Sequence, residues 1–217
     1  MTTRALDDLS IAVVGATGGL GEPIVAELRS RGARVLGCSR HGEVPIDVRD
    51  VAAGDEIVAA ATERFGGLDG VVVASGVVAF GDLVDTDDVV AEELMLTNAL
   101  GPLWLARRTL PALAERQGFF AAITGIVADA PQPGMAAYSA SKAALAAGLT
   151  AIRREFRRRK VAVIDVRPPH TETGLATRPI AGTAPKMPEG LAPEAVARRI
   201  VDAIVAGDDV VTAEMFT

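Results

Sequence analysis

Tyr138 and Lys142 are the residues whose types and spacing point most directly to chemistry. Tyr138 is the only tyrosine of the chain, and Lys142 follows it four residues later. On a helix this spacing places both side chains on one face, within reach of one ligand. A phenol with a pKa of ~10 needs roughly 4 kcal/mol of stabilisation to ionise at neutral pH, and a nearby ammonium supplies part of it. The pair is therefore a candidate for acid–base catalysis.

The segment Gly15–Gly21, GATGGLG, is a candidate phosphate-binding loop. Glycines let backbone N–H groups approach a pyrophosphate at a helix N-terminus, where the helix dipole favours anions. A tight strand-to-helix turn also needs glycine, but the position at the first such turn favours dinucleotide binding. The loop residues expected to contact the cofactor are Gly15, Thr17, Gly18, Gly19, Leu20 and Gly21.

The residues at the end of the second expected strand bear on which dinucleotide is bound. Ser39 lacks the carboxylate that would accept the adenosine 2′-hydroxyl of NAD, whereas Arg40 could pair with the 2′-phosphate of NADP. We therefore expect NADP(H) rather than NAD(H), with an ordinary exposed arginine as the alternative. Asp47 and Val48 could contact the adenine, or Asp47 could cap the following helix.

The hydrophobic pattern predicts the elements that position these residues. Short β-branched runs alternate with segments of helical period, which is typical of βαβ units. Strands are expected at 11–14, 35–38, 71–73, 119–124, 161–166 and 209–212. Helices are expected from Leu20 to Gly32, Val51 to Phe65, Val89 to Leu113, Ala137 to Arg159 and Pro193 to Val205. The fold class is α/β, a Rossmann-type doubly wound, mostly parallel sheet of about 6–7 strands with helices on both faces.

Residues 1–217 are expected to form a single NAD(P)-binding Rossmann domain. The segment 173–191 is rich in Pro, Gly, Ala and Thr and follows the strand ending at Val166. Ligands bind at the carboxyl ends of the strands in such folds. The segment is therefore either a short substrate lid or a plain surface loop.

Several segments resemble one known family. Residues Gly134–Ala144, GMAAYSASKAA, resemble the active-site helix of the classical short-chain dehydrogenases/reductases (SDR). The resemblance runs in order from about Ser10 to Thr173. Further matching segments are the glycine loop, Asp47-Val48, Asp69–Gly76, Asn98–Gly101 (NALG) and Pro168–Thr173.

The resemblance implies a role for each matching residue. Tyr138 would donate or accept the substrate proton, and Lys142 would bind the nicotinamide ribose and lower the pKa of the tyrosine. Asn98 would hold a water that links Lys142 to solvent, and Thr173 would contact the carboxamide. The alternative is that the side chain of Asn98 bonds to the backbone within its helix and has a structural role. Other cofactor contacts that the resemblance implies are Ala74, Ser75, Gly76, Pro168 and Thr171.

The chain also departs from the pattern of that family. Gly125 stands thirteen residues before Tyr138, where the family has a serine that polarises the carbonyl. Thr124 is the nearest hydroxyl and the catalytic candidate in its place, although neighbouring strand residues point to opposite faces. Gln132 is a further possible donor. Losing one such donor typically costs ~100–1000-fold in rate.

Composition and charge exclude several classes. Twenty-two basic and twenty-eight acidic residues give a net charge of −6, which argues against a nucleic-acid or membrane-surface partner. The basic run Arg153–Lys160 is interpreted as a solvated helix end, where cations complement the dipole. One cysteine and two separated histidines suggest no disulfide and no metal site. A cytoplasmic location is expected.

The sequence thus predicts an NADP(H)-dependent oxidoreductase that interconverts a carbonyl and an alcohol. A second hypothesis is an NADP(H)-binding sensor or interaction module with little turnover, which Gly125 favours. Sugar-nucleotide epimerase or dehydratase chemistry ranks last, because the chain is short for the extra domain this needs. A shallow, open pocket near Val77, Phe80, Gln132 and Met135 would suit hydrophobic carbonyl substrates. The resemblance implies a homodimer or homotetramer.

Overall fold

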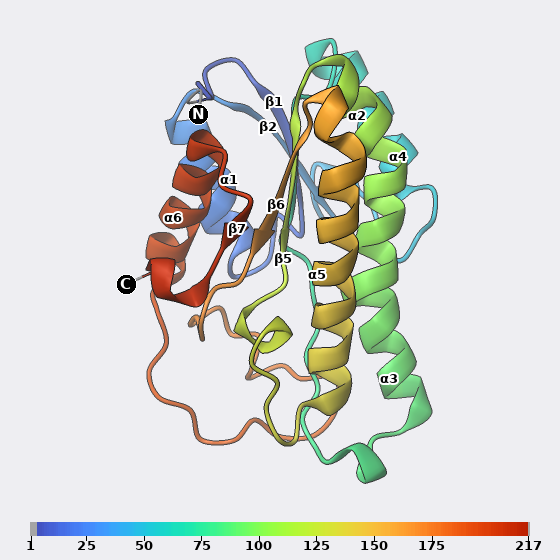
Figure 1. The fold of residues 1–217 in the computed structure, drawn as a ribbon, viewed down its shortest axis with the longest axis vertical. Coiled ribbons are helices and arrows are strands. Elements are labelled where there is room, and N and C mark those ends of the chain that lie inside the picture. Colours follow the sequence, from blue (N-terminus) through green and yellow to red (C-terminus); the bar gives the residue numbers. More distant parts are fainter. Residues whose placement is uncertain (1–3, 217) are drawn as a thin grey trace.

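The computed structural model describes residues 4–216, which fold around one parallel sheet (Figure 1). Its strands are β1 (Ser10–Val14), β2 (Arg34–Ser39), β3 (Val44–Pro45), β4 (Gly70–Val73), β5 (Phe119–Ile123), β6 (Ala162–Val166) and β7 (Val210–Val211). Their order is β3-β2-β1-β4-β5-β6-β7, and every neighbouring pair is parallel. The predicted doubly wound α/β fold is confirmed. The two-residue strand β3 was not expected, because it is too short to show a hydrophobic period.

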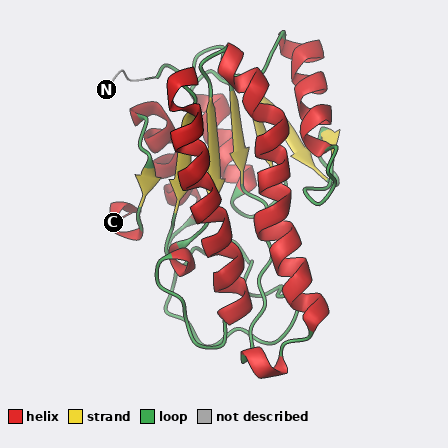
Figure 2. Cartoon of the chain, turned by 45° about the vertical axis from the view of Figure 1, so that its right-hand side comes forward, coloured by secondary structure: helices red, strands yellow, loops and turns green. Residues whose placement is uncertain are grey.

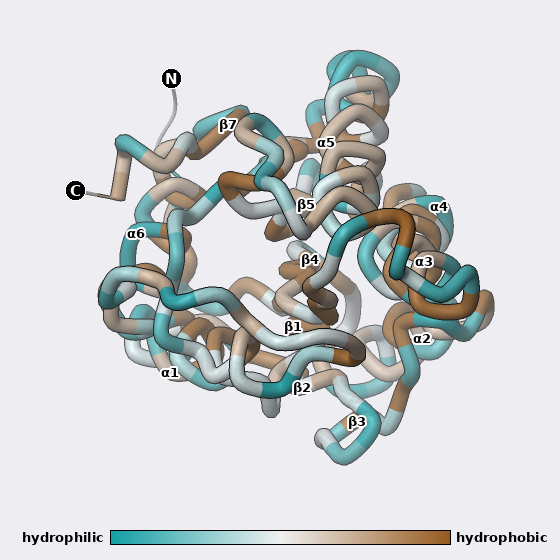
Figure 3. Tube along the Cα trace, turned by 90° about the horizontal axis from the view of Figure 1, so that it is seen from below, coloured by the Kyte–Doolittle hydropathy of each residue, from teal (hydrophilic) through white to brown (hydrophobic). Residues whose placement is uncertain are grey.

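Helices cover both faces of this sheet. They are α1 (Gly21–Ser30), α2 (Ala53–Phe65), α3 (Asp88–Met95), α4 (Gly101–Glu115), α5 (Ala136–Phe156) and α6 (Pro193–Ala206). Seen along the strands, α1 and α6 lie on one side, and α2, α4 and α5 on the other (Figure 3). Alternate side chains of β1 serve the two layers: Ile11 and Val13 pack with α1 and α6, and Ala12 and Val14 with the opposite helices.

The long helical segment expected from Val89 to Leu113 is interrupted, as the Gly101-Pro102 pair predicts. Helix α3 passes into a π-helical turn, Leu96–Leu100, before α4 begins. Pro102 has no N–H group, so the carbonyl of Asn98 has no donor at the usual fourth position along the helix. A side chain at position 101 would collide with the carbonyl of Val48. Glycine there lets α4 pack directly against the turn that follows β3.

The carboxyl ends of the strands all point toward one loop-rich end of the molecule, and α3 and α5 extend beyond the sheet in that direction (Figure 2). Parallel pairing requires this arrangement, because each strand is followed by a crossover to the other end. Among the described residues, no helix has the length and apolar composition needed to cross a membrane.

The segment 173–191 has no regular helix, yet backbone hydrogen bonds attach it at two places. At its base, Glu172 N–H donates to Leu191 O at 3.0 Å. At its middle, Ile180 N–H donates to Val78 O at 2.8 Å and Phe80 N–H donates to Ala181 O at 3.0 Å. The segment is therefore folded onto the residues that follow β4, across the loop-rich end.

Candidate active site

Tyr138 lies in the first turn and a half of α5, at the carboxyl ends of the strands. Its side chain is only 9% exposed and packs in an apolar cluster with Phe80, Leu94 and Val127. Its hydroxyl makes no hydrogen bond to another residue between 4 and 216. On the same face of the helix, Lys142 is 5% exposed, and its Nζ donates to the carbonyl of Ile123 at 2.9 Å. The site thus holds a buried phenol with an unused hydroxyl and a buried ammonium.

Burial shifts the pKa values of these two groups in opposite directions. It raises the pKa of Tyr138 to about 12, because the phenolate loses its hydration. It lowers the pKa of Lys142 to about 8, against the opposing attraction of the Asp165 carboxylate. At neutral pH the protein without ligands therefore presents a neutral phenol, which can donate a proton, beside a cationic lysine.

Asn98 links the π-helical turn to the end of β4 and to α5. Its Oδ1 accepts the N–H of Val77 at 2.9 Å, and its Nδ2 donates to Val77 O at 2.9 Å and to Ser141 Oγ at 3.0 Å. These three hydrogen bonds use both the oxygen and the nitrogen of its side-chain amide. The side-chain contacts with Val77 and Ser141 were not foreseen from the sequence.

Gly76 brings Asn98 and Lys142 together. A Cβ atom at position 76 would lie 3.2 Å from Asn98 Oδ1 and 3.2 Å from Lys142 Nζ. The absence of a side chain therefore opens the space between the end of β4 and the face of α5. Any ligand that crosses the strand ends at this point meets both polar groups.

The glycine loop forms a cradle at the N-terminus of α1. Gly15 has a φ of +86°, and a Cβ there would lie 2.7 Å from the backbone nitrogen of Ser75. Within residues 4–216, the N–H groups of Thr17, Gly19, Leu20 and Gly21 make no hydrogen bond, and no side chain caps the helix. Unpaired donors at a helix N-terminus fit an anion such as a pyrophosphate.

Ser75 supplies a second sign that a ligand belongs beside this loop. Its Oγ is buried and has no hydrogen-bond partner within the described part of the chain. Buried hydroxyl groups are normally paired. Because Ser75 is in contact with Gly15, a polar ligand on the glycine loop would be within its reach. Ala74 precedes it at the end of β4, as expected.

The end of β2 lies next to the loop. Thr17 Oγ1 donates to Ser39 Oγ at 3.1 Å, and Arg40 is exposed without an ion pair to any described residue. Asp47 and Val48 lie further on, after β3. Val48 is buried.

Asp47 does not cap a helix, so that alternative is wrong. Its Oδ1 accepts the N–H of Arg49 at 2.9 Å, whereas α2 starts only at Ala53. The Arg49 guanidinium lies 2.6 Å from the Asp47 carboxylate, whose pKa it lowers, and 3.1 Å from Glu93 of α3. Sequence patterns did not foresee this bridge, because Glu93 lies far along the chain.

Thr173 closes over the glycine loop. Its carbonyl lies so near Gly19 that a side chain at position 19 would collide with it. Just before it, Thr171 Oγ1 donates to the carbonyl of Pro169 at 2.9 Å, and the carbonyl of Pro168 accepts the N–H of Ile126 at 3.0 Å. The loop after β6 therefore ties the glycine loop to the residues that follow β5.

Segment 173–191, the candidate lid, packs against the cluster that contains Tyr138. Leu175, Ala176, Ala181 and Ala184 pack against the apolar cluster that contains the tyrosine. Val77 and Met135 belong to the same cluster, and Phe80 is 7% exposed. These residues give Tyr138 apolar surroundings.

A family model described as short chain dehydrogenase matches residues 43–181. The chain belongs to the short-chain dehydrogenase family. The chain is 29% identical over 226 residues to the dehydrogenase/reductase SDR family member 7B of Bos taurus, covering 89% of this chain and 70% of that protein.

Solved structures resemble the chain along almost its whole length. A short-chain dehydrogenase from Burkholderia cenocepacia in complex with NADP is 30% identical, with a TM-score of 0.79 over 96% of this chain and 89% of that one. A 3-ketoacyl-(acyl-carrier-protein) reductase from Brucella melitensis, complexed with NADH, shares the fold with a TM-score of 0.86 at 21% identity, over 96% and 97% of the two chains.

Gly125 lies at the position where the resemblance to the family implies a serine. Gly125 has a φ of +82°, a conformation that side chains rarely adopt, although no atom would obstruct a Cβ there. Thr124, the expected substitute, is fully buried, and its Oγ1 donates to Asp165 Oδ1 at 2.6 Å. Gln132 is exposed and donates to the carbonyl of Ala130, so it does not fold inward.

Asp165 belongs to a buried ionic network that sequence analysis missed. Its Oδ2 accepts from Arg167 Nη2 at 2.6 Å, and the same guanidinium pairs with Asp129 in the segment after β5. Asp165 is fully buried. A charged pair spaced Asp-x-Arg at the end of an apolar strand was the available signal, because a buried carboxylate needs a partner. The network fixes the segment around Gly125 to the end of β6.

Proposed function

We propose that the protein is an NADP(H)-dependent oxidoreductase that interconverts a carbonyl and an alcohol, with Tyr138 as the acid–base group. The observation that carries the proposal is the unused hydroxyl of the buried Tyr138 side chain, on the same helix face as Lys142 and at the strand ends beside the glycine loop, where no side chain caps α1. The nicotinamide cofactor would supply or accept the hydride. The chain's own residues bind the cofactor and manage the proton.

The residues present fit a dinucleotide. The free N–H groups of the glycine loop would hold the pyrophosphate, and the orphan Ser75 hydroxyl would find a partner beside it. Lys142, near Gly76 and Asn98, would hold the nicotinamide ribose, and Thr173 would face the carboxamide. The NADP complex of the Burkholderia cenocepacia relative supports a nicotinamide cofactor. Arg40, exposed and without an ion pair to another described residue, supports the preference for NADP.

Tyr138 would transfer the proton at the substrate oxygen. With a pKa of about 12 the phenol stays protonated at neutral pH, so in the direction of reduction it can donate directly to a carbonyl oxygen. In the direction of oxidation the phenol must first lose its proton, which the Lys142 ammonium favours. We therefore expect reduction to be the easier direction near neutral pH. The apolar lining from Phe80, Val127 and Leu175 favours a hydrophobic carbonyl substrate.

The test is NADPH consumption by the purified protein across aldehydes, ketones and diketones, with Tyr138→Phe alongside. Turnover that falls at least about 1000-fold in Tyr138→Phe, while the NADPH-induced rise in melting temperature is retained, is the expected result. Turnover that survives the substitution would overturn the assignment of Tyr138.

A second candidate function is an NADP(H)-binding module with little turnover. It is favoured by Gly125, which leaves the site without the usual serine, and by Thr124, whose hydroxyl is committed to Asp165. The same assay separates the two functions. NADPH stabilisation without turnover on any substrate would favour the module.

We also propose that the protein forms a homodimer or homotetramer through α4 and α5. Ala140, Ala147 and Ala151 of α5 are exposed at helical spacing, and Trp104 of α4 is partly exposed. Small residues on such a face let two helices pack closely. Sedimentation velocity measures the mass directly, and a strictly monomeric protein would contradict this proposal.

A further inference from the structure

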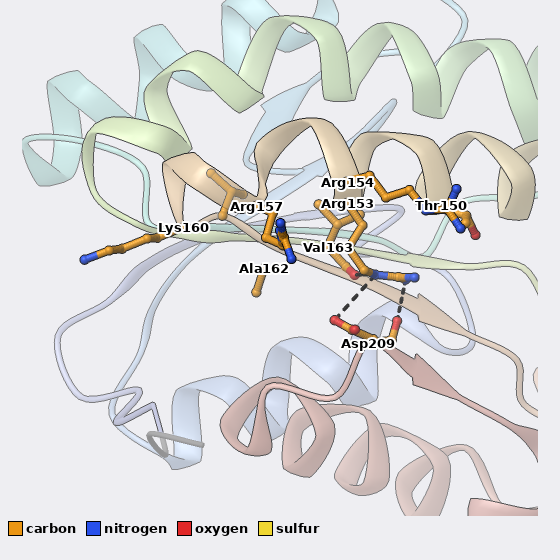
Figure 4. A pocket seen from close by; sticks show the side chains of 9 residues that line it. Thr150, Arg153, Arg154, Arg157, Lys160, Ala162, Val163 and Asp209 are labelled. Atoms are coloured by element: carbon orange, nitrogen blue, oxygen red, sulfur yellow. Dashed lines mark hydrogen bonds and ion pairs between the residues drawn. The ribbon is translucent and has the colours of Figure 1, made fainter.

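A groove with a volume of about 520 Å³ lies at the end of α5 opposite to Tyr138 (Figure 4). The last turns of α5, the residues leading into β6 and the residue before β7 form its walls. Four cations line it: Arg153, Arg154, Arg157 and Lys160. The groove is therefore separate from the candidate active site, which lies at the carboxyl ends of the strands.

The hollow exists because the last strand is short. Strand β7 pairs only with Asp165 and Val166, so the outer edge of β6 from Ala162 to Ile164 has no neighbouring strand. Ala162 and Val163 line the groove at this unpaired edge. The site thus combines an apolar wall with a cationic one.

Arg153 neutralises the only carboxylate that lines the groove. Its Nε donates to Val163 O at 2.7 Å and lies 3.5 Å from the Asp209 carboxylate, and its Nη2 donates to the carbonyl of Asp209 at 2.5 Å. Figure 4 shows this arginine between the helix and Asp209. The remaining three cations are consequently not balanced by an acid of the groove.

Arg154, Arg157 and Lys160 form no ion pair with any residue that the structure describes. In contrast, nine other arginines of the described chain form ion pairs with carboxylates, and Arg153 is one of them. Residues 153–160 hold six cations and one carboxylate, although the chain as a whole carries a net charge of −6. Unpaired like charges side by side are unfavourable, and a bound anion would remove that cost.

We propose that this groove binds a small molecule bearing two or more phosphate groups. Guanidinium groups recognise phosphate by paired hydrogen bonds. The charge of three neighbouring cations suits a compact polyanion better than it suits a ligand with a single carboxylate. The volume lies in the usual range for small-molecule sites. The unpaired edge of β6 offers an apolar surface for the remainder of the ligand. The helix dipole also favours cations at this end of α5, whether or not a ligand binds there. The experiment must therefore distinguish a binding site from cations that only complement the dipole.

Calorimetric titration with inorganic triphosphate at 0.15 M salt, in protein saturated with NADPH, tests the site without involving the cofactor loop. We expect saturable binding that weakens at least about tenfold in the double variant Arg154→Gln/Arg157→Gln. The matched control is Arg158→Gln/Arg159→Gln, which removes the same charge from the same stretch but outside the groove. It should bind nearly as well as the unmodified protein.

Two results would overturn the proposal. One is the absence of saturable triphosphate binding to the unmodified protein. The other is an equal loss of affinity in the two double variants, because general basicity would then explain the binding. Equal melting temperatures of the two variants would show that neither change disturbs the fold.

Discussion

At the scale of single residues, Lys142 carries its charge in a buried position, where desolvation destabilises the charged form. Burial lowers its pKa from 10.5 to about 8, and among residues 4–216 the only acceptor of its ammonium is the carbonyl of Ile123. A buried group of this kind is retained at the expense of stability when a ligand needs it. Tyr138 shows the complementary effect, since its burial raises the pKa of the hydroxyl to about 12 and keeps it protonated.

The lysine predicts a specific pH dependence of stability. Between pH 8 and 10.5 the unfolded chain binds one more proton at Lys142 than the folded protein, so the free energy of unfolding rises with pH. Compared with Lys142→Met, the free energy of unfolding of the unmodified protein should rise by roughly 2–3 kcal/mol over this window and should not change with pH on account of Lys142 below pH 7. Urea unfolding of both proteins at pH 7 and pH 10.5 measures the difference. Parallel pH profiles of the two proteins would show that Lys142 is not buried as a cation.

At the scale of elements, the position of the candidate lid, segment 173–191, depends on its glycines as well as on its backbone hydrogen bonds. Gly182 has a φ of +72°, and a side chain there would collide with the carbonyl of Phe80. Gly174, in the same segment, has a φ of +71° but faces only the flexible ends of Arg178 and Thr177, at 3.5 Å or more. The close approach at Gly182 is what lets Ile180 and Ala181 bond to the residues after β4.

These two glycines form a matched pair of variants. Gly174→Ala should cost about 1 kcal/mol through its backbone conformation alone. Gly182→Ala should in addition detach the middle of the lid, so the amide hydrogens of Phe80 and Ile180 should exchange at least about tenfold faster with solvent. Hydrogen exchange followed by mass spectrometry or NMR distinguishes the two. Equal protection in both variants would mean that the lid is not anchored at Gly182.

At the scale of the whole molecule, one edge of the sheet is completed by the side chain of Arg153. Beyond the two residues of β7, the guanidinium of Arg153 bonds to the carbonyls of Val163 and Asp209 and so joins the edge strand to the segment entering β7. Backbone carbonyls at a sheet edge need such partners, and an arginine also discourages pairing with another chain.

Arg153→Ala should therefore lower the free energy of unfolding by about 1–3 kcal/mol, because two carbonyls lose a charged donor. Arg158→Ala, five residues further along the same stretch and fully solvated, should change it by less than about 0.5 kcal/mol. Urea unfolding at neutral pH measures both. Equal stabilities would mean that water replaces the guanidinium at no cost.

The sequence by itself determined the order of strands and helices, the doubly wound fold, the place of the glycine loop and the proximity of Tyr138 to Lys142. Each depends on residues that are close along the chain: hydrophobic periods, glycines at turns, and a spacing of four on one helix. The break between α3 and α4 followed in the same way from Gly101 and Pro102, since a missing N–H acts locally.

Only the tertiary structure decided which partner each polar side chain takes. Thr124 bonds to Asp165, Arg49 pairs with Glu93 of α3, and the candidate lid bonds to the residues after β4. These contacts join residues from about 40 to more than 100 positions apart, so they depend on strand register and on how helices cross the sheet. The groove beside β6 has the same origin. It opens where one strand stops short of its neighbour, a length that the pattern of residues 209–212 did not reveal.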